Sequence, residues 1–299
     1  MPSLASALMP LVVRVRGSKR RYSSAERTQA HVDKMSAEPA SYAPPTSLGR
    51  KVSIVRDDHD EWPVFRVSPR GPVTDRTVVY FHGGAYLWEI TSTHWRTIAG
   101  LVARTGVTFL VPIYPLAPSA TAESTVAVAT DIAAAAMVRY GSNDVVLMGD
   151  SAGGGLALVV AQQLRDTGHG KNRHTILISP WLDVSMTDPE IERIAPTDPW
   201  LGIPGTKLAG ILYRGSLPED DPRVSPLRGE IRNLAPVTMF SGTRDIANAD
   251  ARALVRLAAA AGTTIDYHEE RGMLHVYPLL PIPEGRRARR HIADIITRR

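Results

Sequence analysis

The residues best suited to chemistry lie in one short sequence, Gly-Asp-Ser-Ala-Gly at 149–153. It has the Gly-x-Ser-x-Gly pattern, and it stands between an apolar, strand-like run and a helix-like segment. In a strand–turn–helix context this pattern places the serine on a strained turn with its hydroxyl exposed. Gly149 and Gly153 lack a Cβ atom, which allows the strand and the helix to approach closely. Ser151 is therefore predicted to be a nucleophile.

A serine hydroxyl near neutral pH needs a base within hydrogen-bonding distance and a third group that orients this base. His275 follows the last strand-like run and is the predicted base, preferred over His268, which lies within that run. Asp245 follows the preceding strand-like run and is the predicted acid, preferred over Asp250 inside the next helix. Singly, Asp245 is as consistent with a helix cap and His275 with a surface loop. Their order after the serine favours catalysis.

Acyl transfer also needs hydrogen-bond donors directed at the oxyanion of the tetrahedral intermediate. Gly83 and Gly84 follow a strand-like run, where the absence of Cβ atoms lets backbone N–H groups turn toward the site. Ala152 directly follows the predicted nucleophile. The N–H groups of Gly83, Gly84 and Ala152 are predicted to form a three-donor oxyanion hole.

Alternating strand-like and helix-like runs must position these residues. The predicted strands are 51–55, 62–67, 77–81, 108–112, 145–149, 175–179, 237–242 and 265–269. The predicted helices are 93–104, 121–140, 152–165, 205–213, 248–261 and 285–297. This alternation is typical of a mostly parallel α/β sheet flanked by helices. No helix separates the first two strands, so they are predicted to form an antiparallel hairpin at one edge.

Two segments interrupt the alternation and are predicted to cap the site. Residues 1–45 form an N-terminal helical piece that ends in a proline-containing linker, and residues 181–225 are rich in proline and glycine. The hydrolase core would then comprise 46–180 and 226–299. An insertion after a strand's carboxyl end lies over the ligand crevice of such a sheet. Trp88, Trp181 and Trp200 are candidate walls of the substrate pocket, with core packing as an equal alternative.

Several motifs together resemble the hormone-sensitive-lipase-like carboxylesterases. They occur in the family's order at 82–85, 114–118, 149–154, 179–183, 221–226 and 273–275. The resemblance implies an α/β-hydrolase fold, with a mostly parallel eight-stranded sheet, flanking helices and a small helical cap. It also implies hydrolysis of short- to medium-chain acyl esters without a cofactor. The resemblance further implies that Asp150 has a structural role beside the nucleophile and is not the acid of the triad.

Three positions depart from the family pattern. Ala85 stands where a third glycine is usual, Glu89 replaces a small residue beside Trp88, and Ser119 replaces a glutamate. Ala85 is expected to leave the oxyanion hole intact, because the predicted donors precede it. Glu89 is expected to alter the rim of the pocket.

The amino-acid composition excludes several other kinds of site and function. The chain has 299 residues and no cysteine, which excludes disulfides, thiolate catalysis and zinc–thiolate sites and fits a cytoplasmic location. Basic residues concentrate in the two tails, five in residues 1–25 and six in residues 285–299, a pattern that does not predict nucleic-acid binding. Apolar runs are too short for stable membrane insertion. No acidic cluster has metal-ligand spacing, so no metal site is predicted, while a homodimer stays open.

Other functions remain as alternatives. An amidase or N-deacylase would use the same triad, and a non-catalytic small-molecule receptor would use the same fold. The presence of His275 at the expected position argues against the receptor. The apolar and then basic N-terminal segment leaves open a lipase that acts at a membrane surface.

Overall fold

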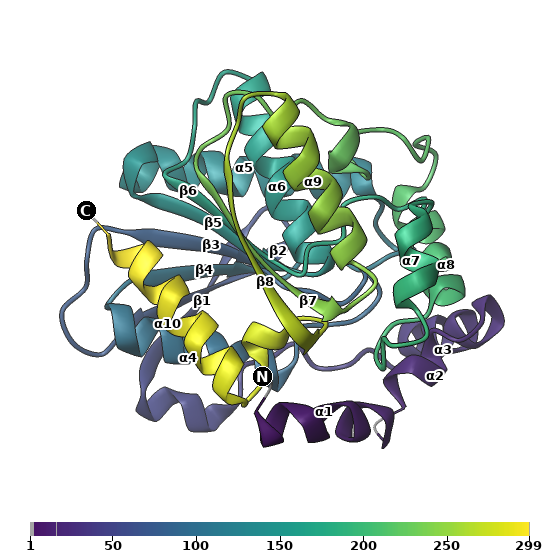
Figure 1. The fold of residues 1–299 in the computed structure, drawn as a ribbon. Coiled ribbons are helices and arrows are strands. Elements are labelled where there is room, and N and C mark those ends of the chain that lie inside the picture. Colours follow the sequence, from purple (N-terminus) through teal and green to yellow (C-terminus); the bar gives the residue numbers. More distant parts are fainter. Residues whose placement is uncertain (1–2, 16, 299) are drawn as a thin grey trace.

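A computed structural model describes residues 3–15 and 17–298 of the chain (Figure 1). Met1, Pro2 and Arg16 of the predicted N-terminal cap segment and Arg299 of the C-terminal basic tail lie outside the described residues. Eight strands form one sheet in the order β1-β2-β4-β3-β5-β6-β7-β8. The strands are β1 (Val52–His59), β2 (Trp62–Pro69), β3 (Thr77–Phe81), β4 (Thr108–Pro112), β5 (Val145–Asp150), β6 (His174–Ile178), β7 (Val237–Arg244) and β8 (Ile265–Leu274).

Helices cover both faces of this sheet. Figure 1 shows α5, α6 and α9 on one face and α4 and α10 on the other. The helices are α1 (Leu4–Val15), α2 (Ser18–Arg21), α3 (Ala25–Ala37), α4 (Ser92–Thr105), α5 (Ala122–Tyr140), α6 (Ala152–Asp166), α7 (Pro189–Ile194), α8 (Ile203–Arg214), α9 (Asn248–Ala260) and α10 (Pro283–Thr297). Four short 3₁₀ turns complete the elements: η1 (Thr46–Arg50), η2 (Ser142–Asp144), η3 (Pro226–Arg228) and η4 (Tyr277–Leu279).

The sequence of the central strands explains this three-layer arrangement. Every residue of β3 and β5 is buried, as expected for strands covered by helices on both faces. Alternate side chains of these strands enter two hydrophobic cores, one under α5, α6 and α9 and the other under α4 and α10. The carboxyl ends of β3, β5, β6, β7 and β8 therefore meet at one rigid edge, because these strands run parallel.

The predicted fold class is confirmed, and each of the eight predicted strands is present. The β1–β2 hairpin is antiparallel and lies at one edge, as predicted. The clearest differences from the sequence prediction concern α7 and β8. The sequence did not predict α7, a helix of only six residues that Asp188 caps. Strand β8 continues five residues beyond the predicted end, past an irregularity in its pairing with β7.

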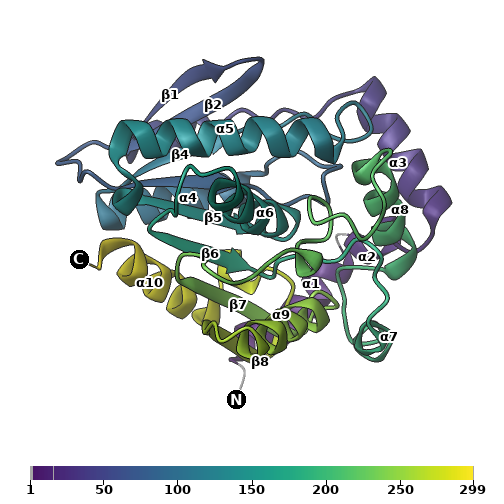
Figure 2. The same ribbon diagram turned by 90° about the horizontal axis from the view of Figure 1, so that it is seen from above.

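The N-terminal helices and the segment after β6 lie together beyond the carboxyl ends of the strands (Figure 2). Helix α3 contacts α8, the Gly205 N–H donates to the Tyr22 carbonyl at 3.0 Å, and the Lys19 ammonium donates to the Ala195 and Asp198 carbonyls. The division of the chain into core and cap segments stays a prediction. Among the described residues, no helix combines the length and apolar character that a bilayer span requires.

Candidate active site

Ser151 occupies a strained turn between β5 and α6. Its backbone has φ 54° and ψ −122°, a region that L-residues rarely adopt. The glycines around it are required by close backbone contacts. A Cβ atom on Gly149 would collide with the Gly153 carbonyl, and one on Gly153 would collide with the carbonyls of Phe81 and His82. The turn therefore presents the Ser151 side chain at the carboxyl edge of the sheet.

The structure brings Ser151, His275 and Asp245 into one hydrogen-bonded line. Ser151 Oγ lies 2.9 Å from His275 Nε2, and His275 Nδ1 lies 2.9 Å from Asp245 Oδ1. Asp245 is fully buried, and its Oδ1 also accepts the Ala247 N–H at 3.0 Å. The carboxylate therefore holds the proton on Nδ1 and leaves Nε2 as an acceptor that faces the serine hydroxyl. Burial opposes protonation of the imidazole, but the charge and hydrogen bond of Asp245 outweigh it and raise the pKa of His275.

A second buried carboxyl group, from the segment after β6, holds the backbone next to Asp245. Asp198 has no exposed surface, and its Oδ1 accepts the N–H groups of Trp200 and Leu201 at 2.7 and 3.0 Å. Its Oδ2 accepts the Ile246 N–H at 3.0 Å, directly after Asp245. Burial, followed by the charge of Asp245, raises the pKa of Asp198 to about 6. The sequence did not predict this residue, because an aspartate before a proline in a proline-rich stretch is typical of a turn.

The structure corrects one part of the predicted oxyanion hole. The Gly83 N–H donates to Asp150 Oδ1 at 3.0 Å, so the prediction that Gly83 supplies a free donor is wrong. By contrast, the N–H groups of Gly84, Ala85 and Ala152 have no acceptor among the described residues. Gly84 and Ala85 adopt φ 140° and 54°, so the loop turns sharply here even without the third glycine of the family pattern.

Asp150 holds this loop in place. Its Oδ1 also accepts the Tyr80 hydroxyl at 2.5 Å, and its Oδ2 lies 3.3 Å from His94 Nε2. The other ring nitrogen of His94 accepts the Thr91 N–H at 3.0 Å, which fixes the proton on Nε2. Burial raises the pKa of Asp150, but His94, Tyr80 and the Gly83 N–H outweigh it and lower the pKa overall. A buried carboxylate thus binds the donor loop to the strand that carries the serine.

His82 braces the same loop from within. It is fully buried, its Nδ1 donates to the Gly83 carbonyl at 2.8 Å, and its ring stacks on Tyr114 with centroids 4.3 Å apart. Burial lowers the pKa of His82 to about 4, so the ring is neutral near pH 7. Its role is therefore to position the loop.

A cavity of about 590 Å³ opens beside Ser151. Trp88, Trp181 and Trp200 all line it, together with side chains of α1 and of the turn after His275. Trp200 meets the His275 ring edge-on at 6.1 Å, and Trp88 donates to the Tyr22 hydroxyl at 2.5 Å. The three tryptophans thus stand at the cavity, and core packing alone does not describe their position.

Glu89 brings a carboxyl group to this mostly apolar cavity. Burial raises the pKa of Glu89 to about 7, and its Oε2 has no hydrogen-bond partner among the described residues. Charge on this carboxyl therefore changes near neutral pH inside the cavity.

The rejected alternatives lie elsewhere. His268 stacks on Phe240 in the middle of β8, with centroids 4.9 Å apart. Asp250 lies in α9, where it accepts the N–H groups of Leu182 and Asp183 at 3.0 and 3.1 Å. Burial raises the pKa of Asp250 to about 8. Asp250 therefore fixes the start of the segment after β6, away from the imidazole of His275.

Comparison with known proteins identifies the family of the chain. A family model described as the α/β-hydrolase fold matches residues 78–279. An acetyl-hydrolase from Streptomyces hygroscopicus is 32% identical over 222 residues, which cover 71% of this chain and 72% of the relative. A triacylglycerol lipase from Mycobacterium tuberculosis is 31% identical over 234 residues, 78% of this chain but 48% of the relative, so the chain spans about half of that protein.

A solved structure agrees with these sequence relatives. An esterase of the bacterial hormone-sensitive lipase family superposes with a TM-score of 0.83 at 25% identity, covering 99% of this chain and 98% of that structure. The chain therefore belongs to the α/β-hydrolase family, among the carboxylesterases of the hormone-sensitive-lipase type that its motifs resemble.

Proposed function

We propose that the chain hydrolyses short- to medium-chain acyl esters through Ser151, His275 and Asp245. The observation that carries this proposal is the continuous line from Ser151 Oγ through the imidazole to a fully buried carboxylate, with 2.9 Å at each step. Each of the three side chains has the partner that its role requires.

Acylation begins when Ser151 Oγ attacks the ester carbonyl and His275 Nε2 takes the hydroxyl proton. Asp245 stabilises the imidazolium that forms. We assign the oxyanion hole to the N–H groups of Gly84, Ala85 and Ala152, which replaces the predicted set by exchanging Gly83 for Ala85. Removal of one such donor typically costs about 2.7–4 kcal/mol in transition-state stabilisation.

Acylation ends when the tetrahedral intermediate collapses and the alcohol leaves with the proton from His275. In deacylation a water molecule donates a proton to His275 Nε2 as it attacks the acyl-enzyme. Collapse of the second tetrahedral intermediate breaks the bond between the acyl group and Ser151 Oγ, Oγ takes the proton back from His275, and the acid is released. No step requires a cofactor.

The cavity supports a small-molecule ester as substrate. Its volume of about 590 Å³ lies within the range of typical ligand pockets, and its walls are largely apolar. We assign Trp88, Trp181 and Trp200 to contacts with the acyl or alcohol group. A series of p-nitrophenyl esters from acetate to decanoate should give the highest kcat/KM between butyrate and octanoate, and a steady rise to decanoate would contradict this assignment.

Replacement of the nucleophile tests the proposed chemistry. Ser151→Ala should lower kcat for p-nitrophenyl butyrate by about 10⁴-fold or more, because the covalent step is lost. Ser124→Ala, at an exposed site in α5, is the matched control and should retain full activity. Retained turnover in Ser151→Ala would refute the assignment. Turnover of the corresponding anilide at a comparable rate would indicate the amidase alternative.

The cellular location, the oligomeric state and the absence of nucleic-acid binding remain predictions. A cytoplasmic location rests on the absence of cysteine. Homodimer formation and the absence of nucleic-acid binding rest on the sequence as well, and sedimentation of the purified chain with and without DNA tests both.

A further inference from the structure

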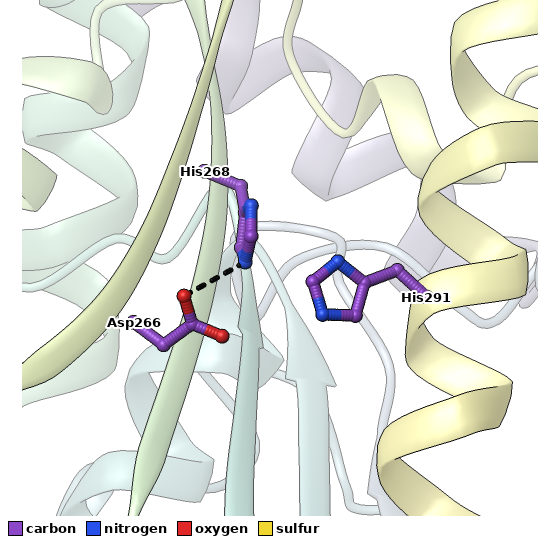
Figure 3. A group of neighbouring side chains, drawn as sticks. All are labelled: Asp266, His268 and His291. Carbon is purple, nitrogen blue, oxygen red and sulfur yellow. Dashed lines mark ion pairs between the residues drawn. The ribbon is translucent and has the colours of Figure 1, made fainter.

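A second histidine–carboxylate group lies on β8, well before the strand reaches the active site. Asp266 and His268 are two residues apart and so lie on one face of the strand, and His291 projects toward them from α10 (Figure 3). One potential ligand atom from each of the three residues lies within 4.8 Å of the other two. Two imidazoles and a carboxylate converge here without any role in the hydrolysis.

Neighbouring side chains fix these ligands in orientation. The His268 ring stacks on Phe240 at 4.9 Å, and the His291 ring meets both Phe240 and His268 edge-on. Thr238 lies 3.3 Å from Asp266 Oδ2, and the His174 ring in turn lies 2.9 Å from the Thr238 hydroxyl. These neighbouring side chains leave Asp266 Oδ1 directed toward His268 Nε2, at 3.0 Å. Such supporting contacts are typical of metal ligands.

Charged side chains of both signs lie near the group. Asp294 adds negative charge nearby, and Arg173 and Arg298 add positive charge.

We propose that Asp266, His268 and His291 bind one divalent transition-metal ion of the zinc class, with water completing the coordination shell. Two histidines and one carboxylate suit Zn²⁺, Co²⁺ or Ni²⁺ better than Mg²⁺ or Ca²⁺, which prefer oxygen ligands. Bonds of about 2.0–2.2 Å would place the ligand atoms roughly 3.4 Å apart, so modest side-chain rotations suffice. Asp266 and His268 are partly exposed, which gives the ion a path from solvent.

The ion would join the last strand to the last helix. Within the described part of the chain, strand β8 is an edge strand that pairs only with β7, and α10 follows the turn after His275. A ligand that binds only the folded chain stabilises it by mass action. Metal binding should therefore raise the melting temperature and keep α10 packed against the sheet. The ion itself would not contact Ser151.

Metal titration of untagged, chelator-treated protein tests this site. Isothermal titration with ZnCl₂ should give one equivalent bound, and a tenfold excess of Zn²⁺ over its Kd should raise Tm by about 2 °C. Co²⁺ should give the visible absorption of a site with nitrogen ligands. His291→Gln and Asp266→Asn should each weaken Zn²⁺ binding at least tenfold, with circular dichroism confirming that both variants fold.

Two further variants separate this site from other histidines. His169→Gln, at an exposed loop, should bind Zn²⁺ as the parent chain does. His275→Gln should also retain the stoichiometric site. The proposal is overturned if no saturable binding occurs, if His291→Gln and Asp266→Asn bind as tightly as the parent, or if binding disappears only in His275→Gln.

Discussion

Two buried histidine–aspartate pairs flank Ser151, and they do different work. His275 and Asp245 lie 2.9 Å apart on one side, and His94 and Asp150 lie 3.3 Å apart on the other. The second ring nitrogen distinguishes them. In His275 it faces the serine hydroxyl at 2.9 Å, whereas in His94 it accepts the Thr91 backbone N–H at 3.0 Å. We therefore assign the role of base to the first pair and the role of structural brace to the second.

The surroundings of the two carboxylates complete the difference. Asp245 accepts hydrogen bonds from the His275 imidazole and from the Ala247 N–H, which lies in the loop that carries Asp245 itself. Asp150 divides its oxygens among a tyrosine, a histidine and the Gly83 N–H, and so fixes the backbone from which Gly84 and Ala85 donate. In the proposed mechanism one pair moves a proton, and the other positions the groups that stabilise charge.

The largest loss of turnover should come from a change in the His275–Asp245 pair. Asp245→Asn should lower kcat by about 10⁴-fold with little loss of stability, because the imidazole loses the partner that fixes its tautomer. Steady-state kinetics with p-nitrophenyl butyrate and a thermal melt measure the two quantities. Asp144→Asn, on an accessible 3₁₀ turn, is the control. Near-normal turnover in Asp245→Asn would remove the distinction between the pairs.

The His94–Asp150 pair should affect turnover through the loop whose Gly84 and Ala85 N–H groups are assigned to the oxyanion hole. A Cβ atom on Gly83 would collide with the Asp150 carboxylate and with its backbone carbonyl. Gly83→Ala should therefore shift the loop and lower kcat by about 10²–10³-fold, with a smaller change in KM. Gly49→Ala has nothing within 4 Å of the added atom and should be neutral. Equal activity of both variants would contradict the brace.

His94 sharpens the comparison further. His94→Gln should lower the free energy of unfolding by about 1–3 kcal/mol, because buried partners lose hydrogen bonds. Turnover should fall by less than tenfold, since the ring does not touch the reacting atoms. Chemical denaturation and kinetics separate the two readouts, with His169→Gln as the control. A loss of turnover as large as that of Asp245→Asn would place His94 in the chemistry.

The pH profile should show the smallest effect. Because the pKa of His275 is raised, kcat/KM should fall as pH decreases through a midpoint above the ordinary histidine value of about 6.5. The charge of Asp198 contributes to this rise. Asp198→Asn should therefore move the acidic limb to lower pH. An unchanged or raised midpoint would show that Asp198 does not act on the base.

Much of this site follows from local sequence, because strand ends and glycine turns have local signatures. Such local signatures predict the strand before Ser151 and the turn that carries it. They also predict that Asp245 and His275 follow two successive strands. Which N–H groups of the donor loop are free could not be predicted, because the answer depends on where the Asp150 side chain points. Asp198 was missed because its local sequence is typical of a turn, and because its partner Ile246 is 48 residues away.

Stoichiometric labelling of Ser151 tests the central claim most directly. A fluorophosphonate should phosphonylate one residue per chain, and peptide mapping by mass spectrometry should place the adduct on Ser151. Labelling should slow by several orders of magnitude in Asp245→Asn and far less in His94→Gln, because only the first variant loses the oriented base. An absent adduct, or one on another serine with Ser151 unmodified, would contradict the account.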